Sequence, residues 1–205
     1  MRKLVYYVAA SLDGFIADQD GDTSRFPIEP ETLNELFARY PETCPCHLRE
    51  VLSVKGEPRR FDTVLMGVRT HEPALDAGLT SAYPHLRQIV VTHRELPMDP
   101  TVERWEGNVA ERVRNLKTEP GKDIWLCGGG SLAGQLLDQI DELQLKINPV
   151  TLGNGVPLFT GSASHTWTPT SIETLPGGGF KRWAQGTLRA SLMVSDSPAS
   201  CVGVR

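Results

Sequence analysis

Apolar and polar residues follow one another along this chain in a pattern that predicts strands separated by helices. Short apolar runs rich in β-branched and aromatic residues predict buried strands at residues 4–10, 62–67, 87–92 and 123–127. Helical spacing predicts helices at 30–40, 70–75, 109–116 and from Gly130 to about Ile140. A short helix or turn is expected at 48–52 and a short edge strand at 102–105. This alternation favours right-handed crossovers and a mostly parallel central sheet flanked by helices on both faces.

The pattern changes after residue 140. Asp141 to Ile147 alternates polar and apolar positions, which predicts a half-exposed strand. Ser171 to Leu175 and Thr187 to Val194 predict two more strands with no helix between them, so we expect antiparallel C-terminal edge strands. Without an internal repeat or interdomain linker, we predict a single α/β domain over residues 1–194 and a disordered tail over 195–205.

Composition narrows the class of protein. The 205 residues carry a net charge of -4 and 40% hydrophobic residues, which suits one soluble domain and argues against a nucleic-acid partner. No apolar run reaches the ~20 residues that span a bilayer, so no membrane partner is expected. The basic-then-apolar N-terminus meets Ser11 and Asp13 too early for a secretion signal, and we expect a cytoplasmic protein.

The four cysteines do not indicate a metal site. They are Cys44, Cys46, Cys127 and Cys201. The segment Cys44-Pro45-Cys46-His47 holds only three potential ligands, and no second cluster completes a tetrahedral set. We therefore expect no metal and interpret these cysteines as reduced thiols, with a redox pair at Cys44 and Cys46 as the weaker alternative.

Three consecutive glycines form the most informative local pattern. Gly128, Gly129 and Gly130 follow the apolar strand at 123–127 and open a helix with Ser131 and Leu132. Glycine lets the backbone approach a ligand closely, and the first turn of a helix presents N–H groups to an anion. The sequence therefore predicts a pyrophosphate site at this junction.

Other polar residues follow neighbouring strands in the same way. Gly67 ends one strand and precedes Arg69 and Thr70, while Thr92, His93 and Arg94 follow the next strand. Ligands of parallel sheets bind beyond the carboxyl ends of the strands, so we expect these residues along one rim. Simpler interpretations exist: Gly67 could only end a strand, Thr70 could only cap a helix, and Arg69 and His93 could lie in solvent.

Four segments together resemble a known superfamily. Residues 8–17, 64–70 and 90–94 and the triple glycine, in this order, are similar to the dihydrofolate reductase superfamily. Residues 11–17 and 148–159 look like its branch with the reductase domain of the riboflavin pathway, the RibD C-terminal domain. The resemblance runs from about residue 3 to 194 and implies a dihydrofolate reductase-like fold, an NADPH-dependent reductase and a homodimer formed through the late strands.

The resemblance also implies roles for individual residues. Those expected at the cofactor are Ala10 and Ile16 beside the nicotinamide, Gly67, Arg69 and Thr70 at its phosphates, Thr92, His93 and Arg94 near the adenosine ribose and its 2′-phosphate, and Gly128, Gly129, Gly130, Ser131 and Leu132 at the pyrophosphate. No acid follows Val91, where an NAD site would place a carboxylate on the ribose, which favours NADPH. The family often has a basic residue where this chain has Val68, which leaves Arg69 and Arg94 to supply positive charge.

The proton source for a reduced substrate has two candidates. Dihydrofolate reductases place a carboxylate on the first helix, where this chain has Glu31 and Glu35 in a different local pattern, and Glu35 is our candidate. Asp13 is the other, although it could simply bond the backbone of its own turn.

We therefore expect a reductase of a small heterocyclic or carbonyl substrate. The chain lacks the His-x-Glu and Pro-Cys-x-x-Cys motifs of a zinc deaminase. The alternatives are the 5-amino-6-(5-phosphoribosylamino)uracil reductase of the riboflavin pathway, a divergent dihydrofolate reductase, and a nucleotide-binding module without catalysis.

Overall fold

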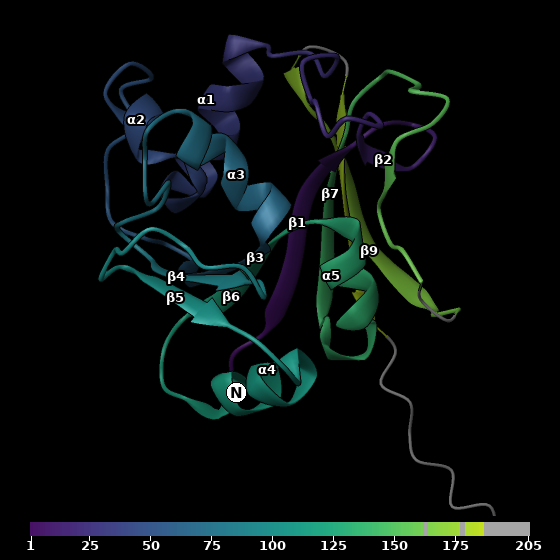
Figure 1. The fold of residues 1–205 in the computed structure, drawn as a ribbon. Helices are drawn as coiled ribbons and strands as arrows, with labels where there is room; N and C mark the ends of the chain where they lie inside the picture. The colour runs from purple at the N-terminus through teal and green to yellow at the C-terminus, as the bar shows by residue number, and fades with distance from the viewer. Residues whose placement is uncertain (162–163, 177–178, 187–205) are drawn as a thin grey trace, which may run out of the picture.

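The computed structural model describes residues 1–161, 164–176 and 179–186. They form one sheet of eight strands, a two-stranded ribbon and five α-helices (Figure 1). The strands are β1 (Leu4–Ala10), β2 (Phe15–Ala17), β3 (Phe61–Gly67), β4 (Arg87–Val91), β5 (Val102–Trp105), β6 (Asp123–Gly128), β7 (Glu142–Ile147), β8 (Val156–Pro157), β9 (Trp167–Thr174) and β10 (Phe180–Gly186). The helices are α1 (Pro30–Arg39), α2 (Cys46–Arg49), α3 (Val68–Asp76), α4 (Val109–Thr118) and α5 (Gly130–Gln135), with 3₁₀ turns η1 (Pro41–Thr43) and η2 (Leu137–Gln139).

The large sheet has the strand order β5-β4-β3-β6-β1-β7-β10-β9. Its first six strands are parallel, whereas β10 and β9 add to β7 in antiparallel register. The predicted fold class is therefore confirmed: a mostly parallel sheet ends in antiparallel C-terminal strands. Strand β9 is the outer edge at that end, and the homodimer expected there stays a prediction.

Most predicted elements occur close to where the pattern placed them. Helix α4 begins after Asn108, whose side-chain oxygen accepts a hydrogen bond from the Glu111 N–H as an N-cap does. The helix expected to run to about Ile140 instead breaks into α5 and η2. Strand β10 was not predicted, and the strand predicted at Thr187 to Val194 and the tail at 195–205 lie outside the described residues. None of the described helices is long and apolar enough to cross a membrane.

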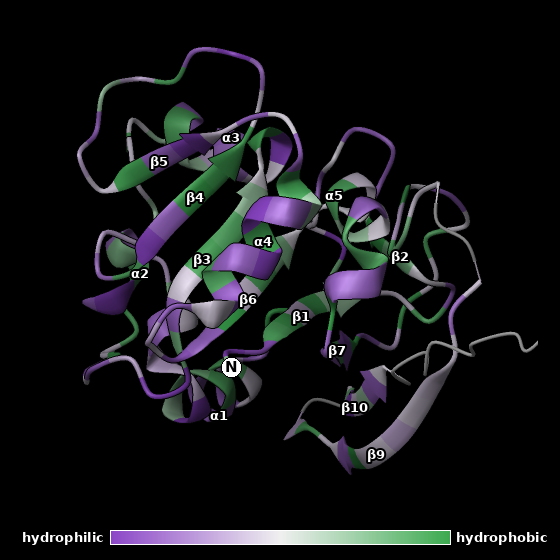
Figure 2. Cartoon of the chain, turned by 90° about the horizontal axis from the view of Figure 1, so that it is seen from below, coloured by the Kyte–Doolittle hydropathy of each residue, from purple (hydrophilic) through white to green (hydrophobic). Residues whose placement is uncertain are grey.

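Helices cover both faces of the sheet, and each face has its own core. On one face, Leu65, Ile89 and Leu126 of the strands pack against Val113 of α4 and Leu132 of α5. Figure 2 shows α4 lying across the apolar strands with its polar side turned outward. A second, more aromatic core with Phe61 and Trp125 lies on the other face. Burial on both faces explains why the parallel strands read as continuous apolar runs.

The prediction that β7 is half-exposed was wrong. It lies between β1 and β10, and its polar residues Glu142 and Gln144 are buried. Glu142 accepts from both Gln144 and Arg60: Gln144 Nε2 donates to Glu142 Oε1 at 2.7 Å, and Arg60 Nη2 donates to Glu142 Oε2 at 2.7 Å. The alternating polar residues therefore face a buried polar cluster rather than solvent.

Lys181 of β10 is the most unusual member of this face. Its side chain is fully buried, and its Nζ lies 4.6 Å from the ring centre of Tyr7, 4.5 Å from that of Tyr40 and 4.9 Å from that of Trp183. Among the described residues, its Nζ has no hydrogen-bond partner. Attraction to the ring faces partly offsets the loss of water around a buried charge. Burial still dominates and lowers the pKa of Lys181 to about 7.

Segment 156–160 packs directly on α5. A Cβ atom added at Gly134 would lie 2.0 Å from the carbonyl oxygen of Thr160, and one at Gly130 would lie 2.0 Å from that of Pro157. The Thr160 N–H also donates to the Gly130 carbonyl oxygen at 3.0 Å. These glycines are therefore required by backbone packing, because any side chain would push the segment away.

We predict that Gly134→Ala destabilises the protein although alanine normally favours a helix by about 1 kcal/mol over glycine. The added methyl group must displace the Thr160 backbone, so the free energy of unfolding should fall by about 2 kcal/mol or more in urea titrations. Gly67→Ala is the control, because a Cβ there has only Gly129 N, at 3.9 Å, within contact distance. Equal stability of the Gly134→Ala variant and the wild type would contradict this packing argument.

We predict that Lys181→Met stabilises the protein at low pH and less so at high pH. The unfolded chain keeps the lysine proton up to about pH 10.4, whereas the folded chain loses it near pH 7. The cost of burying the charge is therefore full below pH 7 and disappears as pH rises toward 10.4. Urea unfolding should show a gain of about 1–3 kcal/mol at pH 6 and a smaller gain at pH 9. A loss of the same size at both values would show that the amine stabilises the fold.

Candidate functional site

The carboxyl ends of the parallel strands meet at one edge of the sheet. In register, Met66 of β3 lies beside Gly128 of β6, and Gly67 lies beside Val91 of β4. On the other side of β6, β1 ends at Ala10. The rim predicted from the sequence is therefore present, and it is fixed by the parallel register.

Residues from three of the predicted segments meet at the triple glycine. A Cβ placed on Gly129 would lie 3.8 Å from Thr70 Oγ1 and 3.9 Å from Ile16 Cδ1, both ordinary contacts. One on Gly128 would lie 3.4 Å from Thr70 Oγ1, and one on Gly67 would lie 3.9 Å from Gly129 N. The glycine junction thus borders β2, the end of β3 and the start of α3. Three of the four motifs converge here, while residues 90–94 are not among these contacts.

The structure requires the three glycines for different reasons. Gly128 has a φ of 143°, a conformation that favours glycine, and Gly129 borders Ile16 and Thr70. Gly130 instead makes room for Pro157, as described above. Leu132 packs into the core, so its side chain is unavailable to a ligand, while Ser131 is exposed. The sequence argument that one anion explains all three glycines was therefore too simple.

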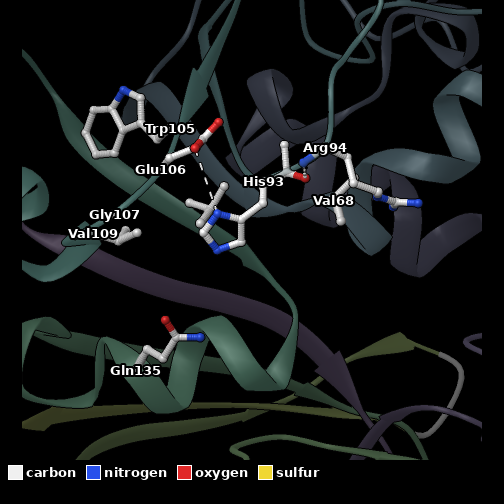
Figure 3. Close-up of a pocket in the computed structure, with 10 residues that line it drawn as sticks. Val68, His93, Arg94, Trp105, Glu106, Gly107, Val109 and Gln135 are labelled. Atoms are coloured by element: carbon white, nitrogen blue, oxygen red, sulfur yellow. Dashed lines mark hydrogen bonds and ion pairs between the residues drawn. The ribbon is translucent and has the colours of Figure 1, made fainter.

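A pocket of about 350 Å³ lies beyond the ends of β4 and β5 (Figure 3). Thr92 at its base is buried: its N–H donates to the Trp105 carbonyl oxygen at 3.0 Å, and its Oγ1 accepts from the Arg94 N–H at 2.9 Å. The lining residues are Val68, Val91, Thr92, His93, Arg94, Trp105, Glu106, Gly107, Val109 and Gln135. The structure therefore brings Thr92, His93 and Arg94 to one pocket, as the sequence predicted.

Carboxylates already pair with most of the positive charge around this pocket. Arg94 forms an ion pair with Glu72, and Arg104 Nη1 lies 2.6 Å from Glu106 Oε1. His93 Nδ1 lies 3.8 Å from Glu106 Oε2, the contact drawn in Figure 3. Arg69 is exposed, and the ion pairs formed by the described residues do not include it. Arg69 is therefore unpaired among the described residues, but its side chain does not line this pocket.

The carboxylate of Asp13 bonds the backbone of the distant loop at residues 152–153 rather than that of its own turn. Its carboxylate accepts the N–H of Leu152 at 3.1 Å and the N–H of Gly153 at 2.7 Å. A hydrogen bond from the Ser11 side chain, followed by those two backbone bonds, lowers the pKa of Asp13 to about 2. A carboxyl with so low a pKa is ionised at neutral pH and is a poor proton donor.

Glu35 is held on the outer part of α1. Its Oε1 lies 3.0 Å from Arg39 Nη2, and Arg39 Nη1 lies 2.6 Å from Glu173 of β9. The guanidinium also lies over the ring of Trp183, at 5.6 Å from its centre. These contacts connect α1 to the antiparallel strands and hold the Glu35 carboxylate against Arg39.

Several pocket residues were missed by sequence reasoning. Glu106 follows β5 as Gly67 and Thr92 follow their strands, so the same rule would have found it. Trp105 and Gln135 carried no comparable signal, because they resemble ordinary core and helix-surface residues. Among the described residues, no group of three or more His, Cys, Asp or Glu is placed to hold a metal ion.

A family model for the RibD C-terminal domain matches residues 2–179. The chain belongs to the RibD C-terminal domain family. One relative is the uncharacterized protein YwjB of Bacillus subtilis (strain 168), which is 30% identical over 164 residues, covering 77% of this chain and 83% of that protein. The family assignment inferred from the four motifs is therefore confirmed.

Solved structures show the same fold. Dihydrofolate reductase from Enterococcus faecalis, in complex with NADP(H) and RAB-propyl, matches with a TM-score of 0.63 and 13% identity, over 90% of this chain and 96% of that chain. A Thermotoga maritima diaminohydroxyphosphoribosylaminopyrimidine deaminase/5-amino-6-(5-phosphoribosylamino)uracil reductase matches with a TM-score of 0.60 and 18% identity, over 91% of this chain and 57% of that chain. This RibD C-terminal domain protein thus has a dihydrofolate reductase-like fold.

Proposed function

We propose that this protein is an NADPH-dependent reductase that transfers hydride to a small heterocyclic or carbonyl substrate. The observation that carries the proposal is the convergence of Ile16, Thr70 and Gly129 at the rim, beside the pocket lined by Thr92 and Arg94. An apolar side chain, a hydroxyl donor and a bare backbone in contact suit a nicotinamide joined to a pyrophosphate.

The residues at the junction fit such a cofactor. Gly129 is extended and carries no side chain, so its backbone is open on the side of Thr70. Ile16 and the end of β1 at Ala10 would form an apolar wall that excludes water from the nicotinamide. Reduced nicotinamide, when bound, supplies the hydride.

Charged groups favour NADPH over NADH. We expect Arg69 and Arg94 to bind the 2′-phosphate. Arg69 belongs to none of the ion pairs of the described residues, and Arg94 would exchange Glu72 for the phosphate. Thr92 follows β4 directly, at the position where an NAD site often has a carboxylate.

Family membership favours one more specific substrate. RibD proteins include the uracil reductase named above, so the reduction of a ribosylaminopyrimidine is the second candidate activity. Titration with NADPH and NADH, followed by a panel of pteridine, pyrimidine and quinone compounds, tests both. Oxidation of NADPH in the presence of a panel compound supports the reductase, whereas tight binding without oxidation would favour a nucleotide-binding module.

We predict that Gly129→Asp abolishes NADPH binding, because a carboxylate would face the pyrophosphate. Thermal unfolding without cofactor should change little, since a Cβ at this position meets only ordinary contacts. Gly129→Asn is the matched control: it adds similar bulk without charge and should lose less affinity in fluorescence titrations. Wild-type NADPH affinity in the Gly129→Asp variant would remove the glycine junction from the site.

For Arg69→Ala we expect affinity for NADPH to fall by about tenfold and affinity for NADH to change much less. A charge-assisted contact to the 2′-phosphate is worth about 1.5–3 kcal/mol, and NADH lacks that group. Arg114→Ala is the control, because Arg114 is an exposed residue of α4 that does not line the pocket. Equal losses for both cofactors would deny Arg69 a role in recognising the 2′-phosphate.

A further inference from the structure

Lys146 of β7 lies beside the end of β1. In register it is opposite Ala9, the residue before Ala10, at the usual spacing of about 5 Å between neighbouring strands. Asn148 fixes this end of β7, because its backbone N–H and its side-chain Nδ2 both donate to the Ala10 carbonyl oxygen, at 2.8 and 3.2 Å. Ala9 shares the face of Lys146 and is small, so no bulky side chain of β1 separates the amine from the rim.

The amine of Lys146 has few partners. Its Nζ makes a long hydrogen bond of 3.4 Å to the carbonyl oxygen of Pro27, just before α1. The ion pairs formed by the described residues do not include it. Burial lowers the pKa of Lys146, while the nearby carboxylate of Glu29 acts in the opposite direction. A half-buried amine with one weak hydrogen bond gains little for the fold and can donate to a ligand.

Lys181 places a second lysine on the same face of the sheet. It lies directly opposite Lys146 in the antiparallel register of β10, so two lysines share one covered surface. Like charges opposite each other destabilise a sheet, and such local conflicts concentrate at functional sites. Lys181 is enclosed by aromatic rings, which leaves Lys146 as the member of the pair that a substrate could reach.

The two acids that the sequence offered as proton sources are engaged elsewhere. Asp13 is ionised and bonded to the backbone of Leu152 and Gly153, and Glu35 is paired with Arg39. Hydride addition to a polar double bond still requires a proton. Lysine is suited to this task when burial lowers its pKa, as it does for Lys146.

We propose that Lys146 is a catalytic residue whose ammonium group contacts the C=O or C=N bond of the substrate and donates the proton that its reduction consumes. The inference rests on the proposed reductase function. The substrate carbon gains a C–H bond from the hydride of reduced nicotinamide, and the π electron pair moves to oxygen or nitrogen. That atom takes a proton from Lys146 Nζ, the nicotinamide is left oxidised, and the neutral amine recovers a proton from water.

Turnover of the variants tests the role directly. Lys146→Met and Lys146→Arg should both lower kcat by about 100-fold or more for the panel compound that the wild type reduces fastest. Arginine keeps the positive charge but does not release a proton at neutral pH, so a wild-type kcat in Lys146→Arg would overturn the proton-donor role. NADPH affinity should stay within about twofold, and Lys55→Met, at an exposed lysine, should match the wild type.

A second readout does not depend on turnover. Pyridoxal 5′-phosphate forms an imine with accessible neutral amines, which borohydride then fixes for peptide mass spectrometry. Lys146 should be modified about tenfold faster than Lys55 at pH 7, and NADPH should slow its modification by occupying the neighbouring rim.

The two experiments separate failure of this inference from failure of the proposed function. Modification of Lys146 no faster than that of Lys55 would overturn the inference even if NADPH binds and is oxidised. Rapid modification of Lys146 that NADPH does not slow, together with no NADPH binding, would overturn the reductase function itself.

Discussion

Parallel hydrogen bonding of β1 to β6 on one side and β7 on the other is the constraint on which the site depends. It places Ala10, Gly128 and Lys146 on three adjacent strands near the same edge of the sheet. The strand order changes direction at this point: β3, β4 and β5 lie beyond β6, while β10 and β9 lie beyond β7. Such a reversal leaves a crevice at the carboxyl ends of the strands, which is where open α/β sheets bind ligands.

The two sides of this crevice differ in chemistry. Toward β4 and β5, side chains are charged and arranged in ion pairs, as at Arg94 with Glu72 and Arg104 with Glu106. When an anionic ligand binds there, an arginine exchanges its carboxylate partner for the ligand. The binding free energy is therefore a small difference between the large energies of the two ion pairs. Toward β7 and β10, two amines have few partners: Lys146 is half-buried with one long hydrogen bond, and Lys181 is buried with no hydrogen-bond partner among the described residues. A nucleotide suits the first side, and a small uncharged or weakly polar group suits the second.

The fold could be predicted from the sequence because most elements have a clear local pattern of apolar residues. Strands such as β1 and β3 are continuous apolar runs, and the motifs after them identified the family. Strand β7 misled the same reasoning, since its alternating pattern looks identical whether polar residues face water or a buried partner. Arg60 and Glu142 are 82 positions apart, so no local pattern reveals that they pair.

Part of the candidate site could also be predicted from the sequence. Residues directly after strands, such as Thr92 and Gly129, follow from topology alone. The role of Gly130 could not be found, because it depends on Pro157, which a sequence pattern does not place against α5. Lys146 was likewise missed, since a lysine at a polar position of an alternating strand is ordinarily solvent-exposed.

The contact between segment 156–160 and α5 has a consequence for biosynthesis. Ile16 belongs to β2, which pairs with β8 at Val156–Pro157, and Pro157 in turn rests on Gly130. A side chain made among the first residues is therefore held in place by residues that leave the ribosome more than a hundred positions later. The nascent chain can form its early strands and helices, but the wall beside the rim is completed only when this late segment has emerged.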